Sequence, residues 1–247
     1  MKVSVITVAF NAEQTIGDTL DSVAEQSHPD IEHIVVDGAS TVGTLGVIRR
    51  RGRHVTRVIS EPGHGLYDAM NKGISAATGE MVGILNADDT YAYADAILNA
   101  AEIMQGENLD ALLADVEFFH PANPTRAIRR YRSERFSPER IAYGWMPAHP
   151  AMFLHRRVYE RFGPYKVDYR IAADFEYVAR IFRHGDLVYR HFPRVVVRMR
   201  MGGVSTGGWQ NTYLLNREVL RACRENGIRT NLLMILSKYP AKLLEFM

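Results

Sequence analysis

Residues 3–11 read VSVITVAFN, and residues 31–40 read IEHIVVDGAS. In each stretch a run of β-branched and apolar residues passes into a short polar segment, which is typical of a buried strand followed by a loop. Similar runs at 55–60 and 80–85 predict two further strands. Helical patterns lie between and after them, at 11–26 with Asn11 as the N-cap, and at 45–51, 66–77 and 92–105. This alternation predicts an α/β fold with a Rossmann-like, mostly parallel sheet and helices on both faces.

The pattern loosens after residue 110. We predict strands at 126–131, 151–155, 187–189 and 194–200, helices at 156–162, 172–183, 208–225 and 230–246, and loops at 133–150 and 201–208. The chain is accordingly divided into residues 1–115, residues 116–205 and C-terminal helices at 206–247.

The composition is that of a globular protein. Of 247 residues, 47% are hydrophobic and 23% are charged, which excludes wholesale disorder. The single cysteine, Cys223, excludes an intramolecular disulfide framework and a cysteine zinc cluster, and it fits a reducing, cytoplasmic compartment. Because the chain opens directly into a strand, we expect no signal peptide. No apolar run reaches the length of about 20 residues that a membrane span needs.

The net charge of +2 conceals an uneven distribution. Residues 1–124 hold 7 Lys and Arg against 18 Asp and Glu, whereas residues 125–247 hold 23 against 10. The two halves could neutralise each other within one fold. Alternatively, the acidic half holds a metal, and the basic half faces phosphate, nucleic acid or an anionic membrane surface. The arginine-rich stretch at 126–132 matches no recognised nucleic-acid-binding module, so we expect no nucleic-acid partner.

Polar residues follow each of the first four predicted strands, where open α/β sheets bind their ligands. Asp88 and Asp89 are adjacent carboxylates that repel each other unless a cation or a hydrogen-bond donor neutralises them. Mg²⁺ and Mn²⁺ take such oxygen ligands. The alternative is a solvated acidic turn ahead of a helix. Asp37 could cap a helix or hydrogen-bond a ribose or a base.

The segment GHGLYDAMNKG at 63–73 runs from a glycine-containing loop into a helix, whose N-terminus attracts phosphate. The chain has no G-x-x-x-x-G-K-[ST] segment, and no G-x-G-x-x-G segment follows its first strand. These absences argue against an ATPase and against a dinucleotide-dependent dehydrogenase.

Taken together, these segments resemble glycosyltransferase family 2. The resemblance is carried by TVAFN at 7–11, VDGAS at 36–40, SEP at 60–62, GLYDAMNKG at 65–73, LNADD at 85–89, HPAMF at 149–153 and YRIAADFE at 169–176. It spans residues 2–205, and it is similar to bacterial enzymes that build exopolysaccharide, colanic acid and lipopolysaccharide.

The resemblance implies a GT-A fold. Residues 1–115 would bind the nucleotide sugar, and residues 116–205 would bind the acceptor as part of the same domain. The resemblance also implies roles for individual residues. The nucleotide would contact Ala9, Asn11, Asp37, Asp68, Lys72 and Asp88, and Mn²⁺ or Mg²⁺ would bind at Asp88 and Asp89, with Asp89 the direct ligand. Asp174 would be the catalytic base, and the acceptor or the diphosphate would contact His149, Gly203 and Ser205.

The implied activity is a metal-dependent, inverting transfer of a hexose from a nucleoside-diphosphate sugar, with a UDP-sugar favoured over a GDP-sugar. The acceptor would be a saccharide or a lipid-linked diphosphate in surface polysaccharide synthesis. Structural alternatives stay open: Asp174 as the acidic first turn of a helix, His149 as part of a turn, and Gly203 with Ser205 as a linker instead of a lid.

Two positions depart from the family pattern. Val42 replaces an acidic residue after the second strand, and Ala173 replaces the acidic residue that often precedes the catalytic base. These departures support one alternative function, a nucleotide- or glycan-binding module with decayed catalysis. A sugar nucleotidyltransferase is a further alternative, but the segment AFNA at 9–12 stands where such enzymes carry a glycine-rich loop.

The apolar C-terminal stretch at 232–246 contains two lysines and is interrupted by Pro240. It could lie on a membrane surface, pack on the core or form a homodimer contact. We therefore expect a cytoplasmic protein, with peripheral contact to the inner face of the cytoplasmic membrane as one use of this tail.

Overall fold

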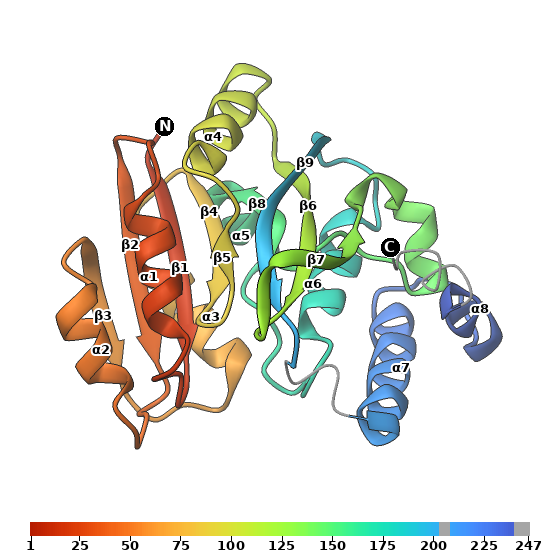
Figure 1. Ribbon diagram of the computed structural model, residues 1–247. Coiled ribbons are helices and arrows are strands. Elements are labelled where there is room, and N and C mark those ends of the chain that lie inside the picture. The colour runs from red at the N-terminus through yellow and green to blue at the C-terminus, as the bar shows by residue number, and fades with distance from the viewer. Residues whose placement is uncertain (203–207, 240–247) are drawn as a thin grey trace.

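A computed structural model of the protein describes residues 1–202 and 208–239. Within these residues one sheet of nine strands runs in the order β3-β2-β1-β4-β8-β6-β9-β5, and β7 pairs with β6 (Figure 1). Helices cover both of its faces. The predicted α/β architecture is confirmed, and the division at residues 115 and 205 stays a prediction.

The first part of the chain alternates strands and helices as predicted. Its elements are β1 (Val3–Ala9), α1 (Ile16–Ala24), β2 (Ile31–Asp37), α2 (Thr44–Arg51), β3 (Val55–Ser60), α3 (Leu66–Ala76), β4 (Met81–Asn86), β5 (Thr90–Tyr91) and α4 (Ala96–Gly106). Strand β1 pairs in parallel with β2 and with β4, so that Ala9 lies opposite Asp37 and Val8 opposite Asn86. The register therefore brings the loops after these strands to one edge of the sheet.

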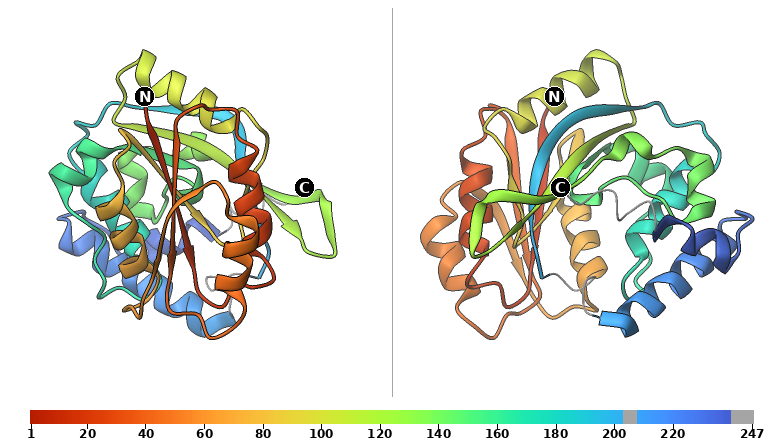
Figure 2. Two further views of the ribbon diagram at one scale, coloured as in Figure 1. Left: turned by 90° about the vertical axis from the view of Figure 1, so that its left-hand side faces the viewer. Right: turned by 45° about the vertical axis from the view of Figure 1, so that its right-hand side comes forward.

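The second part adds strands of both directions to the sheet. Its elements are β6 (Ala111–His120), β7 (Asn123–Tyr131), the 3₁₀ helices η1 (Ser133–Arg135), η2 (Pro138–Tyr143) and η3 (His149–Ala151), β8 (Met152–His155), α5 (Arg156–Phe162), α6 (Ala173–Phe182), β9 (Tyr189–Arg200), α7 (Gly208–Glu225) and α8 (Leu232–Leu236). Strand β8 is antiparallel to both β4 and β6 and joins the two halves of the sheet. Strands β6 and β7 extend outward as a hairpin (Figure 2).

Side chains of the central strands alternate between the two faces of the sheet, and each face is covered by an apolar cluster. Ile6 and Val8 of β1 pack in the same apolar cluster as Met70 of α3, together with α6 and α7 residues. Val5 joins a second cluster with residues of α4 and β6, and Ala9 joins a third with α1 and α2. This explains the near-continuous apolar sequence of these strands.

Two expectations about individual elements are wrong. Asn11 is not a helix N-cap: α1 begins at Ile16 after Thr15, and Asn11 has a positive φ of 50°. The strands expected at 187–189 and 194–200 are one strand, β9, which contains Pro193. The register with β6 shifts between Ala114 and Asp115, and the resulting bulge accommodates a proline that cannot donate to the ladder.

The acidic and basic halves pair with each other inside the fold. Arginines of the second half form ion pairs with acidic residues of the first half. The pairs are Arg130 with Asp115, Arg157 with Asp110 and Arg198 with Glu117, each at 2.7 Å, Arg200 with Asp18 at 3.2 Å, and Arg190 with Glu107. In the arginine-rich stretch, Arg129 lies over the Phe118 ring at 5.0 Å. Neutralisation within the fold therefore accounts for much of the charge asymmetry.

Helix α7 packs against α6, and α8 packs against α7 and η2 (Figure 1). Only the first turns of the helix predicted at 230–246 form α8, and residues 240–247 lie outside the described part. No helix in the described ranges, 1–202 and 208–239, is both long enough and apolar enough to cross a bilayer.

Gly73 allows α3 to approach β1 closely. A Cβ at this position would lie 2.3 Å from Cγ2 of the fully buried Ile6. We expect Gly73→Ala to lower the free energy of unfolding by about 1–3 kcal/mol, because the overpacking cost exceeds the gain in helix propensity. Urea denaturation measures this change.

Gly106 provides the matched control, since it ends α4 and a Cβ there would meet no atom within 4 Å. Gly106→Ala should leave stability unchanged or raise it by up to about 1 kcal/mol. A Gly73→Ala protein as stable as the wild type would show that the α3–β1 contact is not tight.

Candidate active site

The loops after β1 and β2 are tied together at the carboxyl edge of the sheet. Asp37 is fully buried, and its carboxylate accepts hydrogen bonds from Ser40 N at 3.0 Å, Ser40 Oγ and Ser60 Oγ at 2.8 Å. The Asn11 backbone N–H donates to Ser40 Oγ at 2.8 Å, and Asn11 Oδ1 accepts from Thr41 N at 2.9 Å. Asp37 therefore shapes the loop that follows its own strand.

The next loop enters α3 through Gly65, whose φ of 104° is in the region that favours glycine. Asp68 in the first turn accepts from His64 N at 3.1 Å and pairs with Lys72 at 3.1 Å. Lys72 also contacts Glu61 Oε1 at 2.9 Å, and its hydrogen bonds to Glu61 and Asp68 raise its pKa. The two predicted residues on α3 thus form one small charged network at the loop entrance.

Asp88 and Asp89 follow β4 and are withdrawn from solvent. Asp89 is 1% exposed, and burial together with the neighbouring Asp88 raises its pKa to about 8. Burial also raises the pKa of Asp88, with Arg200 acting in the opposite direction. The solvated acidic turn considered from the sequence is therefore wrong for Asp89. This carboxyl group is held in an environment that disfavours its ionised form unless a cation is present.

Two further residues at this position were not singled out from the sequence. The backbone N–H of Arg200, at the end of β9, donates to the Asp89 carboxylate, and its guanidinium pairs with Asp18. Asn86 Nδ2 donates to Asp89 Oδ2 at 3.0 Å, while Asn86 Oδ1 is buried without a hydrogen-bond partner. The LNADD segment indicated Asn86, but nothing in the sequence pairs residue 200 with residue 89.

The donor set suits a hard divalent cation. Two carboxylates and a buried, unpartnered amide oxygen lie in one loop, and oxygen ligands are those that Mg²⁺ and Mn²⁺ prefer. Among residues 1–202 and 208–239, no three His, Cys, Asp or Glu side chains gather closely enough to form a metal cluster alone. A cation here would therefore complete its coordination with ligand oxygens and water, as Mg²⁺ commonly does.

A second group of polar side chains is built around Asp174, in the first turn of α6. Asp174 Oδ1 accepts from Phe175 N at 2.8 Å, and Tyr67 Oη lies 3.4 Å from it while donating to the Ile171 carbonyl oxygen at 2.5 Å. Burial raises the pKa of Asp174, and the nearby His149 acts in the opposite direction. His149 is itself buried, which lowers its pKa, and its Nε2 lies 2.9 Å from Tyr165 Oη. Tyr67 and Tyr165 complete this group, and the sequence analysis did not select either.

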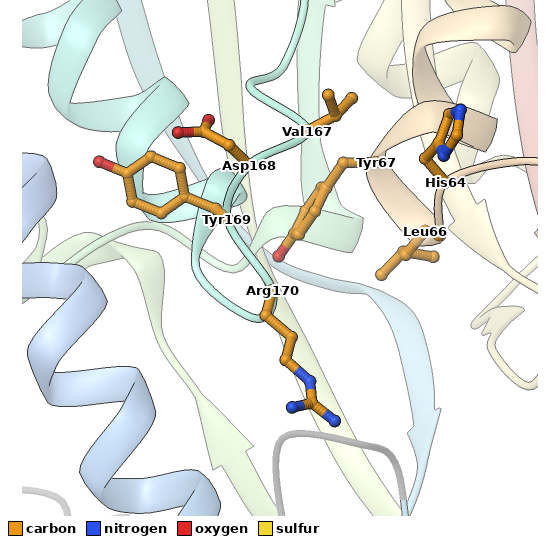
Figure 3. A pocket seen from close by; sticks show the side chains of 8 residues that line it. His64, Leu66, Tyr67, Val167, Asp168, Tyr169 and Arg170 are labelled. Atoms are coloured by element: carbon orange, nitrogen blue, oxygen red, sulfur yellow. The ribbon is translucent and has the colours of Figure 1, made fainter.

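A pocket of about 260 Å³ adjoins the Asp174 group (Figure 3). Its walls are residues 64–67 on one side and residues 167–170 on the other. Tyr67 belongs to both features: its ring lines the pocket, and its hydroxyl reaches Asp174. Leu66 and Val167 are half exposed at the pocket, and Arg170 extends away from Tyr67. The pocket therefore offers a site for a molecule close to a buried carboxyl group.

The predicted residues fall into four contact groups. Hydrogen bonds join Asn11 with the Asp37 loop and an ion pair joins Asp68 with Lys72, whereas Asp88 is adjacent to Asp89 in the chain and His149 is near enough to Asp174 to influence its pKa. Ala9 lies in the core beneath the first group, and its carbonyl accepts from Gly38 N. Helix α3 carries Tyr67 of the Asp174 group and Asp68 of the charged network on consecutive residues. Gly203 and Ser205 lie outside the described residues.

Sequence comparisons identify proteins that are similar to this chain. The model of glycosyl transferase family 2 matches residues 4–163. A PGL/p-HBAD biosynthesis glycosyltransferase of Mycobacterium tuberculosis is 31% identical over 222 residues, which cover 88% of this chain and 82% of that protein. TuaG of Bacillus subtilis, described as a teichuronic acid biosynthesis glycosyltransferase, is 40% identical over 92 residues, 36% of each chain.

Solved structures show the same fold. S. aureus TarS 1–349 in complex with UDP has a TM-score of 0.72 and 18% identity, over 98% of this chain and 72% of that chain. This chain spans 44% of the longer TarS chain. The mannosyltransferase PcManGT of Pyrobaculum calidifontis, in complex with GDP-Man and Mn²⁺, has a TM-score of 0.67 and 24% identity, over 89% and 64% of the two chains.

The fold, the ordered loops at one sheet edge and the sequence relatives agree. The chain belongs to glycosyltransferase family 2 and is a glycosyltransferase.

Proposed function

We propose that this glycosyltransferase is metal-dependent and inverting, and that it moves a hexose from a nucleoside-diphosphate sugar to a saccharide or lipid-linked acceptor. The observation that carries the proposal is the partly buried carboxyl group of Asp174, which lies beside a pocket and near the Tyr67 hydroxyl. The names of the relatives, which concern PGL/p-HBAD and teichuronic acid biosynthesis, support a role in surface glycan synthesis.

Departure of the nucleoside diphosphate requires its negative charge to be stabilised. Asp88 and Asp89, with Asn86 Oδ1, would hold Mn²⁺ or Mg²⁺, which supplies Lewis-acid stabilisation of the diphosphate oxygens when bound. Lys72 is held by Glu61 and Asp68 at the entrance of α3, where it would stand near the phosphates or the nucleoside. Asn11 and the loop shaped by Asp37 would complete the nucleoside site.

Attack by the acceptor requires a base for its hydroxyl proton. Oδ1 of Asp174 is engaged by Phe175 N and Tyr67 Oη, so we assign the incoming proton to Oδ2. The raised pKa of Asp174 makes its carboxylate a stronger base than a solvated aspartate. A single displacement with one base inverts the configuration at the anomeric carbon. We place the acceptor in the pocket between Leu66 and Val167, with His149 behind it.

The solved neighbours bear on the class of donor. TarS has been solved with UDP-GlcNAc and with UDP, and PcManGT with GDP-Man, which supports a nucleotide-sugar donor. The UDP-sugar preference remains our proposal.

Helix α8 bears on the location of the protein. Leu233 is 81% exposed on α8, and with Leu232 it provides an apolar surface for peripheral contact with the cytoplasmic face of a membrane.

Donor turnover across a panel of nucleotide sugars is the primary test. With Mn²⁺ or Mg²⁺, we expect the enzyme to release one nucleoside diphosphate, UDP. In EDTA we expect this release to stop. Release that is insensitive to EDTA would overturn metal dependence. Binding without turnover in the presence of bacterial lipid extract as the acceptor source would favour the decayed binding module.

Substitution of the base tests the mechanism. Asp174→Asn should lower turnover by at least about 10²-fold, because the amide cannot take the acceptor proton, while donor affinity stays within about 2-fold. Asp186→Asn, a surface acid paired with Arg161, is the control and should remain active. Retention of more than about a tenth of wild-type turnover by Asp174→Asn would remove the base assignment.

Substitution at the carboxylate pair tests the metal site. In EDTA at pH 8, Asp89→Asn should raise Tm by about 3–8 °C, because a buried charge beside Asp88 is removed. The same variant should lose metal-dependent turnover and the increase in Tm that Mn²⁺ gives the wild type.

The control for this substitution is Glu102→Gln on the exposed surface of α4, which also removes one negative charge. It should leave both Tm and activity unchanged. An Asp89→Asn protein that Mn²⁺ still stabilises as it does the wild type would contradict the assignment of Asp89 as a ligand.

A further inference from the structure

Helix α7 holds the segment that leads into Asp174. Three of its residues, spaced at i, i+3 and i+7, contact residues 166–172. Glu225 accepts from Lys166 Nζ at 2.8 Å and Tyr169 Oη at 2.9 Å. Arg221 pairs with Asp168 and lies 4.2 Å from the centre of the Tyr169 ring. This face of α7 is therefore committed to one segment of the chain.

The third residue of this face, Glu218, makes a different kind of contact. It is 8% exposed, and its carboxylate accepts three backbone N–H groups, from Arg170 at 2.8 Å and from Ile171 and Ala172 at 2.9 Å each. Ala172 is the N-cap of α6, and its own side chain offers no hydrogen bond. Glu218 thus accepts, from another helix, the N–H of the N-cap residue of α6 and the N–H groups of the two residues before it.

The same helix start carries Asp174 in its first turn. A carboxylate in that position normally gains stability from the helix dipole and from free N–H groups, which lowers its pKa and weakens it as a base. Here the N–H groups of residues 170–172 point at Glu218, and Asp174 Oδ1 accepts from Phe175 N. A second carboxylate therefore lies just before the helix start that carries Asp174, while the first-turn N–H of Phe175 stays with Asp174 itself.

We propose that Glu218 is a positioning residue for the proposed base: it fixes the Arg170–Ala172 segment and places a second carboxylate beside the N-terminus of α6, so that Asp174 is held in the position and the electrostatic surroundings in which it can act as a base. This inference rests on the proposed role of Asp174. It assigns to α7, which lies beyond the matched residues 4–163, a direct part in organising the active site.

The other groups near Asp174 are uncharged or remain paired elsewhere. Tyr67 from α3 reaches it by a hydroxyl, and His149 from η3 and Tyr165 face it from the loop side. Glu176 on α6 is paired with Lys166 and Arg180. Among the described residues, removal of the Glu218 charge therefore changes the surroundings of Asp174 without freeing another buried ion.

Carbon-13 NMR of protein labelled at the aspartate carboxyl carbon provides the test, with the Asp174 signal identified by its absence in Asp174→Asn. In Glu218→Gln the Asp174 titration midpoint should fall by about half a unit to one unit, and amide exchange at residues 170–172 should accelerate. Glu218→Asp, which keeps the charge, should hold the midpoint within about 0.3 unit of the wild type.

Glu225→Gln is the matched control. It loosens the same segment at Lys166 and Tyr169 but leaves the three N–H groups with Glu218, so the Asp174 midpoint should not move. Equal shifts in Glu218→Gln and Glu225→Gln would show that segment packing alone is responsible, and no shift in Glu218→Gln would also overturn the proposal.

If Glu218→Gln does not fold, Glu218→Asp can be compared with the wild type instead. A titration midpoint of Asp174 in Glu218→Asp that is as low as the one expected for Glu218→Gln would count against a role of the charge at position 218. The measurement needs no donor or acceptor. It therefore stands even if Asp174→Asn retains activity and the proposed base is abandoned.

Discussion

The parallel pairing of β1 with β2 and β4 is the constraint on which the rest of this molecule depends. Backbone hydrogen bonds set the register, and the register alone decides that residues 9, 37 and 86 reach the same edge of the sheet. Each strand then ends in a different loop, and each loop adds a different chemical group. Because the strands are buried on both faces, a shift of one residue would exchange the two faces and disrupt the core.

Buried carboxylates in this protein fall into two classes. Asp37, Asp115 and Glu218 are surrounded by donors: Asp115, for example, binds Arg130, Ser133 N and His191. Such groups organise the chain around them through hydrogen bonds. Asp89 is buried, and Asp88 and Asp174 are partly buried, with fewer donors around them, and burial raises the pKa of each. Groups of the second kind cost stability and are the ones assigned to chemistry.

The sequence predicts the alternating half of the fold well because its signals are local. The β-branched runs of β1 and β2 and the loop into α3 are each readable within about ten residues. The site follows from this pattern where residues leave a strand, as Asp88 and Asp89 do. The partners of those residues do not follow from it. Arg200 reaches Asp89, and Glu218 reaches the start of α6, through contacts between distant parts of the chain. The sequence predicts Asn11 as a helix cap because caps are recognised by residue type. In the structure Asn11 instead forms hydrogen bonds with Ser40 and Thr41 of the next loop.

The placement of β9 affects when the carboxylate-pair loop can form during synthesis. Strand β5 follows Asp89 immediately, yet it pairs only with β9, where Thr90 lies opposite Arg198. The loop is thus closed by a segment that leaves the ribosome about a hundred residues later. Contacts between such distant segments form late, because a large loop must close before they are gained. A nascent chain that has completed only β1 to β4 would still lack the strand that closes the loop of Asp88 and Asp89. The final form of this loop therefore depends on the second half of the chain folding onto the sheet.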